Sequence, residues 1–236
     1  MNSILEICQE VADICATQRP TNLFNKSNQN DSIFLSVAKV ELDSLMRYGD
    51  WQDLTKEAVI YTVKNKTVYP IDNIVSDFYS ILNNTIYIKD ESDKVIGAIT
   101  PEDWMKDRYF QADNGRIKFK IQNNCIKFVN APEPNLHIVF MYRSNAVCTD
   151  AETYEDKATI TKNTDKPIFD NYVVKLGITW RWLKRNGLDY TEEFNEYQKE
   201  LKKKFGTSLA TQDINLGGRV FDIDEYGAIN VIKECE

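Results

Sequence analysis

The sequence predicts an α+β protein, with terminal helices forming a helical bundle, an inserted, mostly antiparallel β module, and an extended C-terminal tail. Three observations predict this arrangement. Apolar residues recur at helical spacing near both ends of the chain, β-branched and aromatic residues alternate through its middle, and the last segment has too few apolar residues for a core of its own. The expected units are a discontinuous bundle, a β module and a tail, covering 1–50 with 165–206, 51–150, and 207–236.

Two helices are expected at the N-terminus, over 2–17 and about 32–48. Cys8 and Cys15 share the apolar face of the first helix with Ile4 and Val11. We interpret both cysteines as small buried side chains, although a metal or a disulfide is the alternative reading. Asp31 or Ser32 is the expected cap of the second helix, and Gly49 its end.

The middle of the chain reads as short strands. The segments 57–63 and 67–71, separated by Asn65, predict a hairpin. Thr100-Pro101 predicts the start of a short helix, because threonine caps a helix and proline suits its first position. Residues 144–166 are mostly polar and lack periodicity, which predicts a long surface loop. Further strands are expected at 78–82, 85–89, 95–99, 116–121, 125–129 and 137–142.

A helical hairpin is expected over 167–206. Pro167 suits a first helical position, and Asn186-Gly187 stops the first helix. Asp189 with Glu192 is typical of a capping box for the second helix, which Gly206 ends. The apolar stripes of the two helices are Phe169, Val173, Leu176, Trp180 and Leu183, and Phe194, Tyr197, Leu201 and Phe205.

Composition limits the function classes. The net charge of −7 makes the chain a poor candidate for gripping phosphate backbones. Five scattered cysteines, an odd number, predict reduced thiols in a cytosolic setting. No apolar run is long enough for a transmembrane helix, and the N-terminus lacks the pattern of a signal peptide.

The sequence predicts no catalytic residue, cofactor or metal ligand. Its one histidine, His137, lies within an expected strand, where packing or an edge position is the commoner role. Clustered carboxylates can hold Mg²⁺ in a nuclease, but in an acidic protein we interpret them as turns, caps and solvated faces. These clusters are Asp90, Glu91 and Asp93; Glu102 and Asp103; and Asp222, Asp224 and Glu225.

Basic residues of the C-terminal hairpin have two interpretations. Contact with nucleic acid or an acidic partner is one interpretation of Lys202, Lys203 and Lys204, but we favour a salt-bridged, solvated helix face. Trp182 lies off the stripe that contains Trp180 and is flanked by Arg181 and Arg185. Tryptophan beside arginine is favoured at protein interfaces. The alternative is a tryptophan buried against the β module or the N-terminal helices.

The segment Val173–Leu201, VVKLGITWRWLKRNGLDYTEEFNEYQKEL, resembles the head-to-tail connector adaptors (tail accessory factors) of short-tailed bacteriophages. That family has an L-G-x-x-W-R-W-like helix followed by G-L-D-Y and a helix rich in Glu and Tyr. Further pieces follow the family's order, over about residues 37 to 201. They are DWQDLTKEA at 50–58, Tyr69-Pro70, Asp77-Phe78 and GAITPEDW at 97–104. The chain departs from the family at Val75-Ser76, where a proline usually precedes Asp-Phe.

The resemblance implies a non-enzymatic structural protein of the virion neck that passes through the host cytoplasm during assembly. Such adaptors form a ring beneath the portal protein, usually of twelve copies, and join it to the tail tube or nozzle. DNA is retained by the ring or passes its lumen without specific binding, and no membrane is involved. Interface contacts are expected at Arg181, Trp182, Arg185, Tyr190, Phe221 and Val231. The alternatives are a phage-encoded metal-dependent nuclease or cell-wall hydrolase, and a binding protein unrelated to virions.

Overall fold

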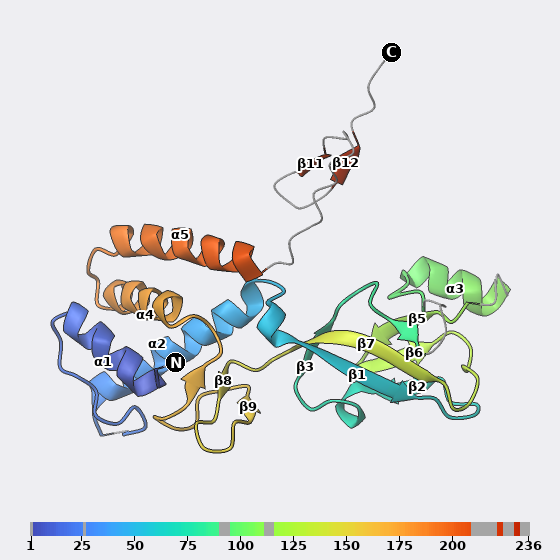
Figure 1. Cartoon of the computed structure of the whole chain (residues 1–236), viewed down its shortest axis with the longest axis horizontal. Coiled ribbons are helices and arrows are strands. Elements are labelled where there is room, and N and C mark those ends of the chain that lie inside the picture. Colours follow the sequence, from blue (N-terminus) through green and yellow to red (C-terminus); the bar gives the residue numbers. More distant parts are fainter. Residues whose placement is uncertain are drawn as a thin grey trace, which may run out of the picture.

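A computed structural model describes residues 2–25, 27–89, 95–110, 116–208, 221–223 and 229–231. In this part of the chain, helices and antiparallel sheets combine into the predicted α+β fold. Figure 1 shows the long helices at one end of the molecule and the larger sheets at the other. Each end has its own buried hydrophobic cluster.

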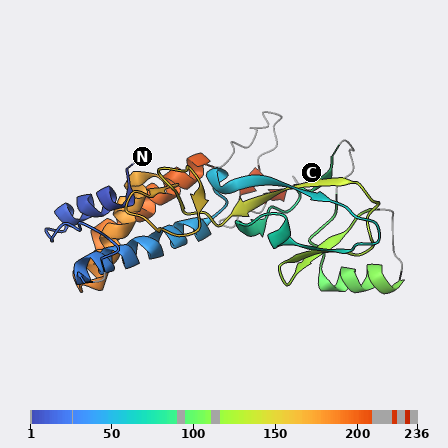
Figure 2. The same cartoon turned by 90° about the horizontal axis from the view of Figure 1, so that it is seen from below.

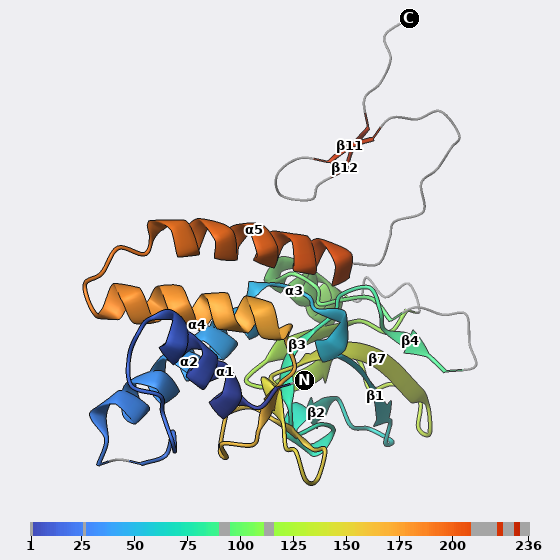
Figure 3. The same ribbon diagram turned by 60° about the vertical axis from the view of Figure 1, so that its left-hand side comes forward.

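The helical half contains α1 (Ile4–Ile14), α2 (Gln29–Tyr48), α4 (Asn171–Arg185) and α5 (Thr191–Ser208). Figure 3 shows α4 in the middle, with α5 on one side and α1 and α2 on the other. Apolar residues of all four helices therefore meet in one core. The shared core confirms the predicted pairing of N-terminal and C-terminal helices.

Several predicted helix ends are wrong. Helix α2 begins at Gln29, where the Asn28 side chain accepts a hydrogen bond from the amide of Asn30. Asp31 is therefore a buried residue within the helix and not its cap. Pro167 lies in a strand, and α4 starts at Asn171, capped by the Asp170 carboxylate. Helix α5 runs past Gly206 to Ser208.

The first sheet of the β half is built around β7 (His137–Ser144). Strand β1 (Thr55–Tyr61) pairs with β7 along its whole length, and β3 (Phe78–Ile81) and β4 (Tyr87–Ile88) pair with its other edge. The second sheet has the order β2-β6-β5, from β2 (Val68–Pro70), β6 (Cys125–Phe128) and β5 (Phe119–Gln122). Helix α3 (Pro101–Phe110) starts after Thr100, as predicted.

The predicted hairpin of residues 57–63 and 67–71 is wrong. Asn65 does turn the chain, with a φ of 62°, but β1 pairs with β7 and β2 pairs with β6. The two segments therefore belong to different sheets, since each finds a longer or better-buried partner far along the chain. Of the strand expected at 95–99, the structure shows only an isolated bridge from Ile96 to Lys118.

Residues 144–166 do not form the predicted surface loop. They contain β8 (Cys148–Thr149) and β9 (Asp156–Lys157), which form a small sheet with β10 (Lys166–Pro167). Val147, Cys148 and Ile160 are buried in the core of the helical half. This segment therefore belongs with the helices. Figure 1 shows it below α1 and α4.

In the tail, β11 (Phe221–Ile223) pairs with β12 (Ile229–Val231), in agreement with the two strand-like pieces expected there. None of the helices within the described ranges combines the length and the apolar character needed to cross a membrane.

Candidate functional site

The segments that carry the resemblance do not converge on a pocket. Residues of Val173–Leu201, DWQDLTKEA and Asp77 lie at two places: the contact between α2 and α4, and the connection between the helical half and the β half. Tyr69-Pro70 lies in β2, and Trp104 of GAITPEDW lies in α3.

The contact between α2 and α4 is built on a buried ion pair. Arg181 Nε donates to Glu41 Oε2 at 2.6 Å, and its Nη2 donates to Ser44 Oγ at 3.0 Å. The Glu41 side chain is 0% exposed and that of Arg181 is 21% exposed. Burial raises the pKa of Glu41, while the hydrogen bond from Arg181 opposes this rise. The guanidinium also lies 4.4 Å from the centre of the Trp180 ring.

Gly177 is required by the same ion pair. A Cβ atom at Gly177 would collide with the carboxyl group of Glu41. The glycine one turn before Arg181 therefore leaves the space in which the Glu41 carboxylate lies. This gives the L-G-x-x-W-R-W-like segment a packing function.

We expect Gly177→Ala to lower the free energy of unfolding by about 1–3 kcal/mol, because overpacking would displace a buried, paired carboxylate. Gly206→Ala is the matched control in α5. A Cβ atom at Gly206 meets nothing within 4 Å, so this variant should be unchanged or stabilised by up to about 1 kcal/mol. Chemical denaturation monitored by circular dichroism measures both. Equal stability losses in the two variants would contradict the proposed packing role.

Trp182 is buried in its own chain and is not an exposed interface residue. Only 8% of it is exposed, and its ring stacks on Phe34 of α2 at 6.2 Å between ring centres. Trp180 packs on the opposite side, edge-to-face with Phe194 of α5 at 5.0 Å. Both tryptophans are buried because α4 is covered on two sides, so a single apolar stripe underestimates its buried surface. The alternative of burial against the N-terminal helices therefore holds for Trp182.

The other predicted interface residues have varied positions. Arg181 is engaged by Glu41, Arg185 is exposed, and Tyr190 is half-buried beside Trp180. Phe221 and Val231 are paired in β11 and β12, and their side chains fall outside the described part of the chain. The structure thus leaves Arg185 and part of Tyr190 accessible on this surface.

An aromatic cluster joins the end of α2 to the last helix. Trp51 donates from Nε1 to the carbonyl of Leu45 at 2.7 Å. Its ring packs edge-to-face against Phe169 and Phe205, with ring centres 5.5 Å and 5.2 Å away. The Phe205 ring lies so close to Gly49 that a Cβ atom there would collide with it. The DWQDL segment therefore fixes the point at which the chain leaves the bundle.

Asp77 organises the polar side of the same connection. Its carboxylate accepts hydrogen bonds from Lys56 Nζ at 2.7 Å, Tyr142 OH at 2.8 Å and Ser144 Oγ at 2.8 Å. Burial raises the pKa of Asp77, but these three donors together hold it below its usual value. Lys56 also pairs with Asp156 at 2.6 Å, so it joins β1 of the β half to the small sheet of the helical half. Because three donors already occupy the Asp77 carboxylate, we interpret it as fixing the connection between the two halves rather than acting on a substrate.

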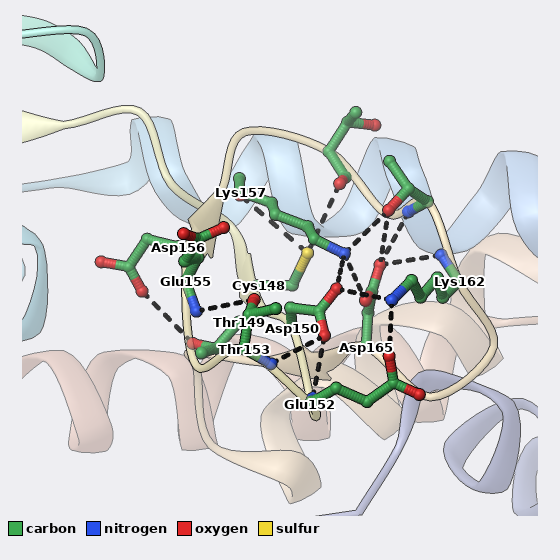
Figure 4. A network of polar contacts seen from close by, with 12 residues as sticks. Cys148, Thr149, Asp150, Glu152, Thr153, Glu155, Asp156, Lys157, Lys162 and Asp165 are labelled. Carbon is green, nitrogen blue, oxygen red and sulfur yellow. Dashed lines mark hydrogen bonds and ion pairs between the residues drawn. The ribbon is translucent and has the colours of Figure 1, made fainter.

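A dense network of charges holds residues 148–165 together (Figure 4). Lys157 Nζ pairs with Asp150 at 2.6 Å and with Asp165 at 2.8 Å. Lys162 pairs with Asp150 at 3.1 Å. Asp165 is 0% exposed and also accepts the backbone amides of Thr161 and Lys162, at 2.7 Å and 2.9 Å. The network explains why a segment without an apolar pattern is nevertheless packed.

The histidine and the acidic residues considered above for catalysis or metal binding contact neighbouring side chains where the structure describes them. His137 is exposed at the start of β7 and packs edge-to-face against Tyr61. Glu102 pairs with Lys106, and Asp103 contacts Thr100 at the start of α3, as expected of helix caps. Within the described ranges, no three His, Cys, Asp or Glu residues are grouped to hold a metal ion. Asp90, Glu91, Asp93, Asp224 and Glu225 lie outside those ranges, and Asp222 is described only by its backbone.

The cysteines that the structure describes are free thiols. Burial raises the pKa of both Cys8 and Cys148 to about 12, so both thiols are protonated at neutral pH. The position of Cys8 in the helical core confirms its interpretation as a small buried side chain.

The sequence matches no protein-family model, and a search of the curated proteins finds no significantly similar one. The family resemblance therefore rests only on the ordered segments given above.

Proposed function

We propose that the chain is a structural virion protein, a head-to-tail connector adaptor that forms a ring beneath the portal and joins it to the tail tube or nozzle. One observation carries this proposal. Three of the family-like segments, Val173–Leu201, DWQDLTKEA and Asp77-Phe78, contain residues that fix α2 against α4 or the helical half against the β half. An adaptor that positions partners needs such fixed geometry, whereas an enzyme would use its distinctive residues around a substrate.

The outer face of the first sheet offers a surface for assembly. Val59 and Tyr61 of β1 lie opposite Val139 and His137 of β7, and Met141 follows on the same face. Tyr61 is 65% exposed and Met141 is 37% exposed, while the two valines are half-buried. Solvated faces of antiparallel sheets are usually polar, and exposed apolar patches favour protein–protein contact. We assign this face to contacts between neighbouring copies in the ring.

The proposed partners are the portal protein and the tail tube or nozzle protein, with DNA passing through the ring. The test is to mix the chain with the portal ring of the same genome and to measure the mass of the complex by native mass spectrometry. Addition of a closed ring, with twelve copies expected, agrees with the proposal. A chain that stays monomeric beside the portal at high concentration contradicts it.

Tyr61→Ser should weaken assembly, because an exposed aromatic side chain in an interface commonly contributes about 2 kcal/mol or more to binding. The concentration needed for half-maximal ring formation is expected to rise by about tenfold or more. Tyr154→Ser is the matched control, since Tyr154 is 79% exposed in the turn before β9. If both variants assemble like the wild type, the first sheet is not the contact surface.

A further inference from the structure

A basic cluster covers the end of the molecule farthest from α1. The ring of Trp104 in α3 has Lys120 Nζ at 4.1 Å from its centre and the Arg108 guanidinium at 5.9 Å. Lys120 of β5 lies directly opposite Lys127 of β6 in the strand register. Figures 1 and 2 both show α3 and these strands at the outer end of the β half. Arg116 is exposed just before β5.

Two acidic residues of α3 are already engaged by lysines. Glu102 pairs with Lys106, and Asp107 pairs with Lys118 at 2.9 Å, which ties α3 to the strand beneath it. Among the residues that the structure describes, no carboxylate forms an ion pair with any member of the basic cluster, defined as Arg108, Arg116, Lys120 and Lys127. Lys127 instead donates to the amide oxygen of Gln122 at 3.2 Å.

This arrangement is unfavourable for an isolated chain. Like charges directly opposite each other destabilise a sheet, and within the described ranges neither of the two opposed lysines forms an ion pair with an acid. The chain as a whole has a net charge of −7, so the positive charge at this end runs against its composition. The Trp104 ring and the Asp107–Lys118 ion pair hold α3 in place, so that Arg108 and Lys120 lie over the same ring.

We propose that the basic cluster contacts the phosphate backbone of a nucleic acid without reading its base sequence. A nucleic-acid backbone has the dense negative charge that several adjacent cations match, and its bound counterions are released on contact. An acidic protein segment has a lower density of charge and must order flexible side chains. Lys120 and Lys127 are half-buried and share one face of the sheet, so their ammonium groups can reach phosphates at its edge, and the buried Trp104 ring leaves no stacking surface for bases. The inference concerns the single chain and does not depend on ring formation.

The test is fluorescence anisotropy of a labelled, mixed-sequence DNA duplex with the full chain, between about 20 and 200 mM salt. The wild-type chain should bind at low salt, with a slope of log K against log salt of about −3, as expected for three to four phosphate contacts. The Lys120→Glu/Lys127→Glu double variant should weaken binding at least tenfold and reduce the slope by about two. Lys120→Arg/Lys127→Arg should bind like the wild type. An RNA duplex should bind comparably, because the backbone chemistry is shared.

The matched control is Lys202→Glu/Lys203→Glu on the exposed face of α5, which changes the net charge equally. This control should remain within about twofold of the wild type if contact is local to the β half. Absence of wild-type binding at low salt, or equal losses in both double variants, overturns the proposal. Binding of poly-glutamate as tight as that of DNA also overturns it, in favour of an acidic protein partner. Circular dichroism checks that each variant is folded.

Discussion

Replacing Arg181 by methionine is expected to lower the free energy of unfolding by about 3–5 kcal/mol, because the buried Glu41 carboxyl loses its charge partner and must either stay ionised alone or take up a proton. Glu41 is 0% exposed and receives its hydrogen bond from Arg181, so its carboxylate has no route to water when the guanidinium is removed. The loss should exceed that of Glu41→Gln, since Arg181 is partly exposed and can be hydrated when its partner is neutral.

The stability lost in Arg181→Met should increase with pH. Burial raises the pKa of Glu41, and Arg181→Met removes the hydrogen bond and the charge that oppose this rise. The folded variant therefore holds a proton on Glu41 that the unfolded chain, with a pKa of about 4.3, releases. The pKa of Glu41 is also raised in the wild type, so the stability difference between wild type and variant should grow as the pH rises above the folded pKa of wild-type Glu41.

Urea denaturation of the wild type, Arg181→Met, Glu41→Met and Glu41→Met/Arg181→Met measures the coupling. The double variant replaces both charges by adaptable apolar side chains, so it should recover to within about 1–2 kcal/mol of the wild type. A double variant that is as unstable as the sum of its single substitutions would show that charge burial is not the source of the loss.

Asp165→Ala should destabilise the chain by about 3–5 kcal/mol, since it removes a buried charge partner and leaves two backbone amides without their acceptor. Asp165 accepts from Thr161 and Lys162 and pairs with Lys157. Its own carbonyl accepts the amide of Ile4 at the start of α1. Residues 148–165 should therefore become accessible to proteases before the rest of the helical half does.

Limited proteolysis with mass-spectrometric mapping checks this expectation. Glu152→Ala is the matched control, because the Glu152 side chain is 75% exposed and pairs only with Lys162 at the surface. This control should cost less than about 1 kcal/mol. Unchanged protection of the segment in Asp165→Ala would contradict the role given to the network.

Acid should weaken the same segment in the wild type. Burial raises the pKa of Asp165, but the Lys157 ion pair and the two amides outweigh it and hold the pKa below its usual value. The stability from this group is present above the unfolded value of about 3.9 and is lost as the pH falls through the lower folded value.

Local patterns in the sequence predicted the elements well where the apolar period was long. The stripe from Phe194 to Phe205 and the Asn186-Gly187 stop gave α4 and α5 in the right places, as did Thr100-Pro101 for α3. The α+β class followed from the same periods. The strands expected at 116–121 and 125–129 correspond to β5 and β6.

Long-range pairing and charge burial were not predictable in this way. Nothing within 57–71 indicates that β1 pairs with β7, so the prediction of a hairpin between the two neighbouring segments is wrong. The 144–166 segment is held by ion pairs, which leave no apolar period to recognise. The acidic and basic residues Asp150, Lys157, Lys162 and Asp165 could have indicated ion pairs within this segment. Trp182 was ambiguous because one stripe cannot show that α4 is covered on two sides.

We propose that the task of this chain is to hold its partners in a fixed geometry, and not bond-making chemistry. The most direct measurement is electron cryomicroscopy of the portal ring of the same genome incubated with the full chain. We expect a closed ring of density beneath the portal. Each copy should keep the helical and β halves arranged as in Figure 1, and neighbouring copies should meet at the first sheet. A bare portal at saturating concentrations of the chain would contradict it.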